Sequence, residues 1–198
     1  MTERFTILSL QRIPLALVAL RLALAPTILL VAAVRPNAAA FGICLVLAFL
    51  SDYFDGVIAR RLGVVTEFLR HADSVVDTVF YLCTAAAIAL TAPEILSQRW
   101  FALLVLLSLE VARYVFDLRK FGKEAAYHMW SSKLWGLLLF LGAFSVLALN
   151  TASWLVALAI YWGVLADLEG LAISLVLRRW RADVPTYWHA RKLARTDA

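Results

Sequence analysis

Charged residues are scarce in this sequence. They make up 17% of its 198 residues, whereas 63% are hydrophobic. This composition and a mean hydropathy of +0.82 exclude an ordinary soluble domain of that size. The charges stand in short clusters, separated by apolar runs that are long enough to cross the ~30 Å hydrocarbon layer as helices. The sequence therefore predicts an integral membrane protein whose charged clusters are loops and helix ends.

Several other features are missing. Cys44 and Cys83 lie in apolar runs without a Cys-x-x-Cys or Cys/His spacing, so we interpret both as packing residues and predict no disulfide or zinc site. The N-terminus lacks the charged start, short apolar core and small-residue cleavage site of a removable signal peptide, so we expect a permanent first span. Internal repeats, low-complexity tracts and Gly/Ser linkers are also missing, and we expect a single domain over residues 1–198.

Six apolar windows predict six transmembrane helices, over residues 14–34, 38–60, 73–92, 100–120, 132–149 and 154–176. Basic residues gather in alternate loops and at the C-terminus, whereas the other loops hold only Arg35 and Arg99. The positive-inside rule makes the basic side cytoplasmic, which places both termini there and requires an even number of spans. We therefore expect an all-α integral membrane fold with six transmembrane helices and both termini cytoplasmic.

The two ends of the chain flank this predicted bundle. Residues 1–13 form a juxtamembrane segment in which 2–11 suit a short interfacial helix, and 177–198 form a basic, loosely ordered cytoplasmic tail. The net charge of +5 does not indicate a nucleic acid partner. Most of the excess basic residues flank hydrophobic spans, where Lys and Arg set topology and hold lipid headgroups.

Four aspartates stand where a membrane makes charge costly. Asp52 and Asp55 lie at the end of the second predicted span, and Asp73 and Asp77 at the start of the third. Spacings of i,i+3 and i,i+4 project each pair from one helical face, and the short turn over 62–69 makes the two helices antiparallel neighbours. Converging carboxylates repel unless a cation neutralises them or some are protonated. Oxygen ligands without His or Cys favour Mg²⁺, Mn²⁺ or Ca²⁺ over zinc.

Small residues follow the first aspartate pair. Gly56 and Ala59 share a helical face one turn further on, and Arg60 stands at the membrane edge. Absent side chains let a ligand or a neighbouring backbone approach the helix, and the planar guanidinium of Arg60 suits a phosphate. Taken singly, Gly56 and Ala59 are better explained as helix-packing residues and Arg60 as a positive-inside anchor. Beside the aspartates they favour a phosphate slot.

The spacing Asp-x-x-Asp-Gly-x-x-Ala-Arg followed by Asp-x-x-x-Asp, from Asp52 to Asp77, resembles the signature of the CDP-alcohol phosphotransferase (CDP-alcohol phosphatidyltransferase class I) family. These are integral membrane enzymes of phospholipid synthesis. The six-helix layout and the pattern over 21–26 in the first span extend the resemblance. One position departs from the pattern, because the family usually has Gly four residues before the third Asp and this chain has Leu69, which adds bulk beside the nucleotide slot.

The resemblance implies divalent-metal-dependent transfer of a phosphatidyl or similar phosphoalcohol group from a CDP-linked lipid donor to an alcohol acceptor, with release of CMP. It implies one or two Mg²⁺ or Mn²⁺ ions held by Asp52, Asp55, Asp73 and Asp77. Asp77 is either a ligand or the general base for the acceptor hydroxyl. The implied CDP pocket comprises Asp52, Asp55, Gly56, Ala59 and Arg60, with Thr66 as a helper.

The resemblance also suggests partners and a location. The partners are the CDP-linked lipid donor, the alcohol acceptor and membrane lipids, and a homodimer is compatible with the resemblance although no residue establishes it. We expect a multi-pass protein of the bacterial inner (plasma) membrane with its active site facing the cytoplasm. The motif leaves the acceptor open among glycerol 3-phosphate, inositol or its phosphate, serine and another phosphatidyl lipid.

Basic residues near the fourth and fifth spans are candidates for acceptor binding. Arg113 and Lys133 could hold a phosphate and His128 could orient a hydroxyl, which favours a phosphorylated acceptor such as glycerol 3-phosphate. Arg113 equally fits an ion pair within its own helix, with Glu110 or Asp117 one turn away. Acidic residues in the sixth span, Asp167 and Glu169, are either functional or hydrogen-bonded to a neighbouring helix.

Two other classes of protein could carry acids in a membrane. A small metal or ion transporter would need polar residues through the full depth of several helices, whereas the acids of the second and third spans gather at one end. A non-catalytic scaffold leaves the spacing of the four aspartates unexplained. The sequence therefore favours the enzyme and keeps the transporter as the alternative.

Overall fold

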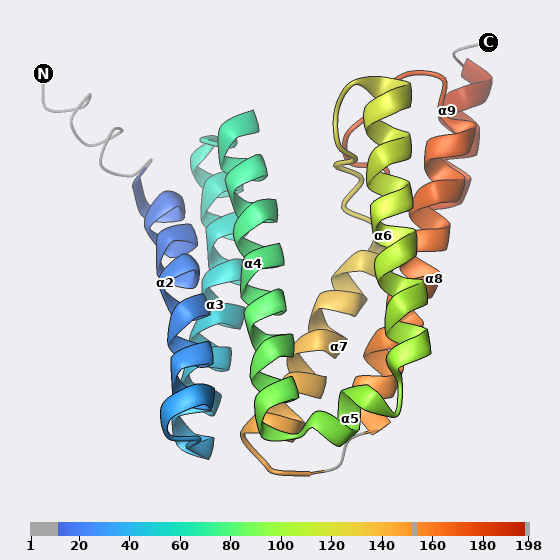
Figure 1. Cartoon of the computed structure of the whole chain (residues 1–198). Helices are drawn as coiled ribbons and strands as arrows, with labels where there is room; N and C mark the ends of the chain where they lie inside the picture. Colours follow the sequence, from blue (N-terminus) through green and yellow to red (C-terminus); the bar gives the residue numbers. More distant parts are fainter. Residues whose placement is uncertain (1–11, 152–153, 197–198) are drawn as a thin grey trace, which may run out of the picture. The chain divides into compact units, whose positions relative to one another are not determined.

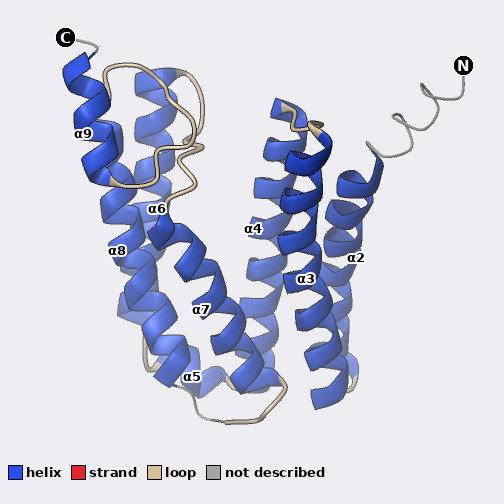
Figure 2. Ribbon diagram, turned by 180° about the vertical axis from the view of Figure 1, so that it is seen from behind, coloured by secondary structure: helices blue, strands red, loops and turns tan. Residues whose placement is uncertain are grey.

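The computed structural model describes residues 12–151 and 154–196, and all regular secondary structure in that part of the chain is helical (Figure 2). The described helices are α2 (Arg12–Val34), α3 (Ala38–Leu62), α4 (Glu67–Thr91), α5 (Pro93–Ser97), α6 (Trp100–Phe121), α7 (Trp130–Leu147), α8 (Trp154–Val176) and α9 (Tyr187–Thr196). The prediction of an all-α fold is confirmed. The interfacial helix predicted over 2–11 lies outside the described residues.

Five of these helices are long and apolar enough to cross a membrane, namely α2, α3, α4, α7 and α8. Helix α6 forms where the fourth span was predicted, yet it is not among the five, because acidic and basic residues recur from Glu110 to Lys120. The chain is thus a multi-pass membrane protein by the composition of its helices. Six spans and two cytoplasmic termini stay predictions.

The described chain forms two compact units, coloured along the sequence in Figure 1. The first contains α2, α3, α4 and residues 93–94 of α5, and the second contains the rest of α5 with α6, α8 and α9. Helix α7 contributes residues 130–142 to the second unit and its remaining residues to the first. The single domain expected over 1–198 stays a prediction.

In the first unit, local capping fixes where α3 and α4 begin and end. The Asn37 side chain accepts a hydrogen bond from Ala40 N at 2.9 Å and starts α3. Gly63 stops α3 by taking a left-handed conformation, with φ 65°. Thr66 then caps α4, which begins six residues before the predicted start at Asp73. The turn between the helices is therefore only residues 63–66, and the boundary predicted from hydrophobicity was wrong.

Helix α2 packs against both α3 and α4, and the three run side by side (Figure 1). All three helices carry buried apolar residues, among them Ala25 and Ile28 of α2, Leu45 of α3, and Phe80 and Ala87 of α4. This packing fixes the rotation of each helix about its axis, because the apolar residues that face the core are three or four positions apart and share one helix face. The polar residues of the site are held by this apolar core.

In the second unit, α6 packs on α8, and α9 packs on α8 as well. The loosely ordered tail predicted after residue 177 is wrong for residues 187–196, which form α9. Ala190 of this helix joins a buried cluster with Ile173, Leu177 and Val184. Tyr127 belongs to the same cluster, and burial raises the pKa of its hydroxyl, which lies 2.9 Å from Ser174 Oγ. Residues 187–196 are mostly polar, and the contacts that Ala190 makes in this buried cluster hold them as a helix on α8.

Candidate active site

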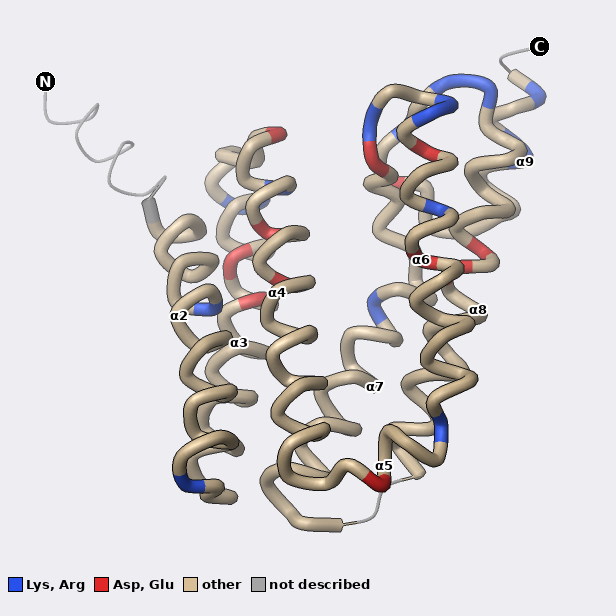
Figure 3. The backbone as a smooth tube through the Cα atoms, viewed as in Figure 1, with Lys and Arg blue, Asp and Glu red and all other residues tan. Residues whose placement is uncertain are grey.

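Two adjacent helices of the first unit supply the four aspartates. Asp52 and Asp55 project from the last turns of α3, and Asp73 and Asp77 from the early turns of α4. Figure 3 shows the acidic positions of α3 and α4 at a common level, beside a basic position of α2. The short turn 63–66 joins the two helices, both of which pack against α2, and the carboxylates of Asp52 and Asp55 lie close to that of Asp73 as expected.

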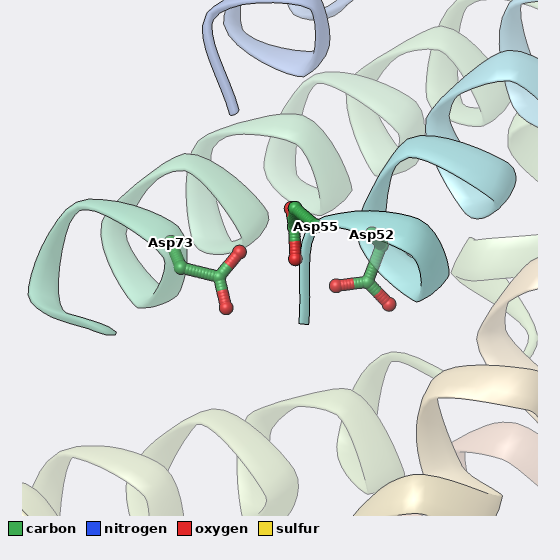
Figure 4. Close-up of side chains that lie close together, drawn as sticks. All are labelled: Asp52, Asp55 and Asp73. Carbon is green, nitrogen blue, oxygen red and sulfur yellow. The ribbon is translucent and has the colours of Figure 1, made fainter. Parts of the chain in front are cut away.

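Three of the aspartates approach one another closely. Asp52, Asp55 and Asp73 each offer a carboxylate oxygen, and these oxygens all lie within 4.8 Å of one another (Figure 4). We call these three residues the carboxylate trio. Asp77 lies outside it, although it shares a contact with the trio through Arg21. The structure therefore brings all four predicted carboxylates together around Arg21.

Exposure differs sharply among the four carboxylates. The side chain of Asp55 is 6% exposed, whereas that of Asp52 is 47% exposed. Asp73 and Asp77 are intermediate between these two. The site is therefore anchored at Asp55 in the helix packing and open to solvent at Asp52. An ion or an anionic ligand could reach the carboxylates from the open side without unfolding the helices.

A fifth residue of the site is Arg21, whose role the sequence did not reveal. Arg21 lies in the middle of α2 and is 1% exposed. Its Nη1 lies 3.3 Å from Asp52 Oδ1 and 3.0 Å from Asp73 Oδ1, and it also contacts Asp77 Oδ1. Its Nη2 contacts Asp55 Oδ2. One guanidinium thus forms ion pairs with all four carboxylates, two from α3 and two from α4.

The residues predicted to line a nucleotide pocket follow the first aspartate pair on α3. The guanidinium of Arg60 folds back over Gly56, where an added Cβ would lie 3.2 Å from Nη1 of Arg60. Ala59 is buried in the helix packing, as expected for a small packing residue. Gly56 therefore provides space for the Arg60 side chain, and Arg60 is an exposed residue five positions after Asp55.

The start of α4 accounts for the two other predicted positions. Thr66 Oγ1 accepts a hydrogen bond from Leu69 N at 3.1 Å, so its hydroxyl serves as a helix cap. Leu69 stands in the first turn of α4 with a partly buried side chain. The helical backbone at this position does not require glycine, which explains why α4 tolerates leucine there.

Arg113 of the second unit is held by two carboxylates. Its Nη2 lies 2.8 Å from Glu110 Oε1 on the same helix, and its Nε lies 3.1 Å from Asp167 Oδ1 on α8. The ion pair with Glu110 is one of the two that the sequence suggested, whereas the second partner comes from α8 rather than from Asp117. Gly170 of α8 leaves room for this contact, because a Cβ there would lie 3.0 Å from Arg113 Cδ.

The remaining acceptor candidates and Glu169 also have local partners in the second unit. Lys133 Nζ lies 4.6 Å from the centre of the Trp130 ring, a cation–π distance. Nε2 of His128 lies 3.8 Å from Asp183 Oδ1. Glu169 accepts hydrogen bonds from Ser131 Oγ at 2.6 Å and Tyr187 N at 3.2 Å, which bears out a hydrogen-bonding role for this acid.

Comparison with known proteins agrees with the site. The family model for CDP-alcohol phosphatidyltransferase matches residues 11–177, which is most of the chain. No curated protein and no solved structure matches the sequence significantly. The chain belongs to the CDP-alcohol phosphatidyltransferase family, a class of phosphotransferases that transfer a phosphoalcohol group from a CDP-alcohol. The resemblance that the aspartate spacing indicated is confirmed.

The chemistry of the site suits the divalent metal that this family generally uses. The carboxylate trio offers only oxygen ligands, which hard cations such as Mg²⁺ and Mn²⁺ prefer. The same oxygens already surround a cationic group, the Arg21 guanidinium. The residues present therefore fit a divalent ion.

Proposed function

We propose that this protein is a divalent-metal-dependent CDP-alcohol phosphatidyltransferase of phospholipid synthesis. It transfers a phosphatidyl group from a CDP-linked lipid to an alcohol and releases CMP. The observation that carries the proposal is the convergence of Asp52, Asp55 and Asp73 within 4.8 Å on two adjacent helices. The family match over residues 11–177 supports the same reaction.

The four aspartates would divide the work. Asp52, Asp55 and Asp73 would hold Mg²⁺ or Mn²⁺, as one or two ions. When bound, the metal supplies positive charge that neutralises the diphosphate and the leaving CMP. Asp77, which lies outside the carboxylate trio, would accept the proton of the acceptor hydroxyl. The acceptor oxygen then forms a bond to the lipid-linked phosphorus, and the bond from that phosphorus to the oxygen of CMP breaks.

The CDP-binding part would lie along α3. Gly56 and Ala59 leave the surface of α3 low beside Asp52 and Asp55, and the exposed guanidinium of Arg60 could donate to a phosphate. Thr66 would contribute by holding the first turn of α4, because its hydroxyl is already used as a cap. Leu69 partly fills the space where other members of the family carry glycine.

The acceptor is the least constrained part of the proposal. Lys133 and His128 remain candidates for binding an acceptor phosphate or hydroxyl. Arg113 is a weaker candidate than its sequence position suggested, because Glu110 and Asp167 already neutralise its charge. Among the alcohols compatible with the motif, we propose a phosphorylated acceptor such as glycerol 3-phosphate.

The test is CMP release by the purified protein, with Mg²⁺ or Mn²⁺, CDP-diacylglycerol and a panel of alcohols. We expect Asp77→Asn to abolish turnover while CDP binding partly survives, because the carboxylate trio remains. Glu94→Gln is the matched control, since it removes a carboxylate beyond the opposite end of α4. Full activity of Asp77→Asn, or the lack of CMP release with every alcohol, would refute the proposed reaction.

A further inference from the structure

Arg21 occupies a place that is costly for a cation. It is 1% exposed in the middle of an apolar helix that is long enough to cross a membrane. A charged side chain at such a depth needs a partner of opposite charge. The four aspartates provide that partner, from both α3 and α4. Arg21 and the aspartates therefore stabilise one another across three helices.

The contacts of Arg21 differ from an ordinary arginine–carboxylate pair. A guanidinium usually meets one carboxylate through two parallel N–H bonds. Here a single nitrogen, Nη1, contacts the carboxylates of Asp52, Asp73 and Asp77, although an Nη atom carries only two hydrogens. Three carboxylates around one nitrogen resemble ligands around a cation. Asp52 and Asp73 also belong to the carboxylate trio.

Charge gives the second part of the argument. When each carboxylate is counted as −1 and the guanidinium as +1, this group has a formal charge of −3. The excess negative charge attracts a divalent ion to the same oxygens that contact Arg21. The ion and the guanidinium would also repel each other at such short range. The two cations must therefore compete for the carboxylates.

We propose that Arg21 is a positioning residue that holds both aspartate pairs together when no divalent ion is bound, and that ion binding displaces Nη1 from Asp52 and Asp73. The proposal rests on the metal site in the proposed function. Arg21 then has two effects. It stabilises the ion-free protein, and it weakens ion binding, so that the ion stays exchangeable. A residue that serves only to pack α2 would have the first effect but not the second.

The experiment compares the full chain in detergent micelles with Arg21→Met, which keeps similar bulk without charge, and Arg21→Lys, which keeps the charge without the planar fork. Arg35→Met is the matched control, because Arg35 is exposed and directly follows the C-terminal end of α2. Mn²⁺ affinity is measured from the electron paramagnetic resonance signal of free Mn²⁺. Thermal unfolding is measured in EDTA and in saturating Mn²⁺.

We expect Arg21→Met to bind Mn²⁺ at least about tenfold more tightly than the unaltered chain, because a nearby positive charge is gone. Its melting temperature should fall in EDTA and recover most of that loss in Mn²⁺. Arg21→Lys should bind Mn²⁺ within about threefold of the unaltered chain and show a smaller loss of the same kind. Arg35→Met should change neither quantity.

Unchanged or weaker Mn²⁺ binding by Arg21→Met would overturn the proposal, as would an equal loss of melting temperature with and without Mn²⁺. If Arg21→Met does not fold, Arg21→Lys decides in the same way, since a loss in EDTA that Mn²⁺ fails to reduce overturns the proposal. Neither measurement uses CDP. Mn²⁺ binding without CMP release would refute the proposed reaction alone, and CMP release with unaltered Mn²⁺ affinity in Arg21→Met would refute the role of Arg21 alone.

Discussion

The ion pairs of Arg113 allow a quantitative prediction. The Arg113 side chain is 19% exposed and that of Asp167 is 2% exposed, so their contact is largely shielded from water. Removing one partner of a buried pair costs ~3–5 kcal/mol, because the other charge stays buried without compensation. Arg113→Met leaves Asp167 and Glu110 without their cation, and the residual exposure of Arg113 favours the lower end. We expect Arg113→Met to destabilise the protein by about 3 kcal/mol.

Two further variants separate the charge from the packing. Asp167→Asn keeps an oxygen that can accept from Arg113 Nε, and Arg113 keeps its pair with Glu110, so the cost should be about 1–2 kcal/mol. Arg113→Met combined with Asp167→Leu removes both buried charges and should be more stable than Arg113→Met alone. Arg119→Met, which removes an exposed arginine from the same helix, should change stability by less than about 0.5 kcal/mol.

The assay is reversible unfolding in mixed micelles, together with the KM for the acceptor. We expect the order of stability given above and an acceptor KM that changes little in Asp167→Asn. The reasoning fails if Arg113→Met unfolds at the same denaturant concentration as the unaltered chain while its acceptor KM rises. That outcome would make Arg113 a phosphate-binding group rather than a structural cation.

The remaining predictions concern packing and capping. Gly163→Ala should destabilise the second unit by about 1–3 kcal/mol in the same unfolding assay, because a Cβ there would lie 2.7 Å from the Trp135 ring and 2.8 Å from Leu106 Cδ1. Gly136→Ala is the control and should be neutral or slightly stabilising, because a Cβ added at Gly136 would meet no neighbouring atom within 4 Å. Equal effects of the two substitutions would contradict the packing around Gly163. Thr66→Ala should cost about 1 kcal/mol through the lost cap, whereas Thr66→Ser should cost less, and equal losses would argue against a capping role.

The sequence predicted most of the helices because long apolar runs are a direct signal for spans. Helix α8 has the predicted bounds, and α3 and α6 differ from prediction by one or two residues at their ends. The start of α4 was missed because residues 67–72 are mixed polar and apolar, so hydrophobicity gives no signal there. The cap formed by Thr66 was a usable signal. Helix α9 depends on tertiary contacts around Ala190, which composition alone does not reveal.

The candidate site shows a similar division. The spacing of the four aspartates sufficed to predict that they share one place, because helix periodicity and a short turn leave few alternatives. A lone arginine in an apolar span signals a buried partner, so Arg21 could have been singled out. Its partners could not, since they depend on the rotation of α2 against α3 and α4. The same limit applies to Arg113 and Asp167, which lie 54 positions apart in the sequence.

The central claim is that the chain catalyses transfer rather than ion transport or simple hydrolysis. The most direct measurement follows CMP and lipid products together, with CDP-diacylglycerol, Mg²⁺ and each alcohol in turn. We predict that at least one alcohol gives CMP and an equal amount of a new lipid phosphodiester containing that alcohol, and that EDTA abolishes both. Divalent-ion uptake into liposomes without CMP formation, or CMP formation without a matching lipid product, would contradict the account.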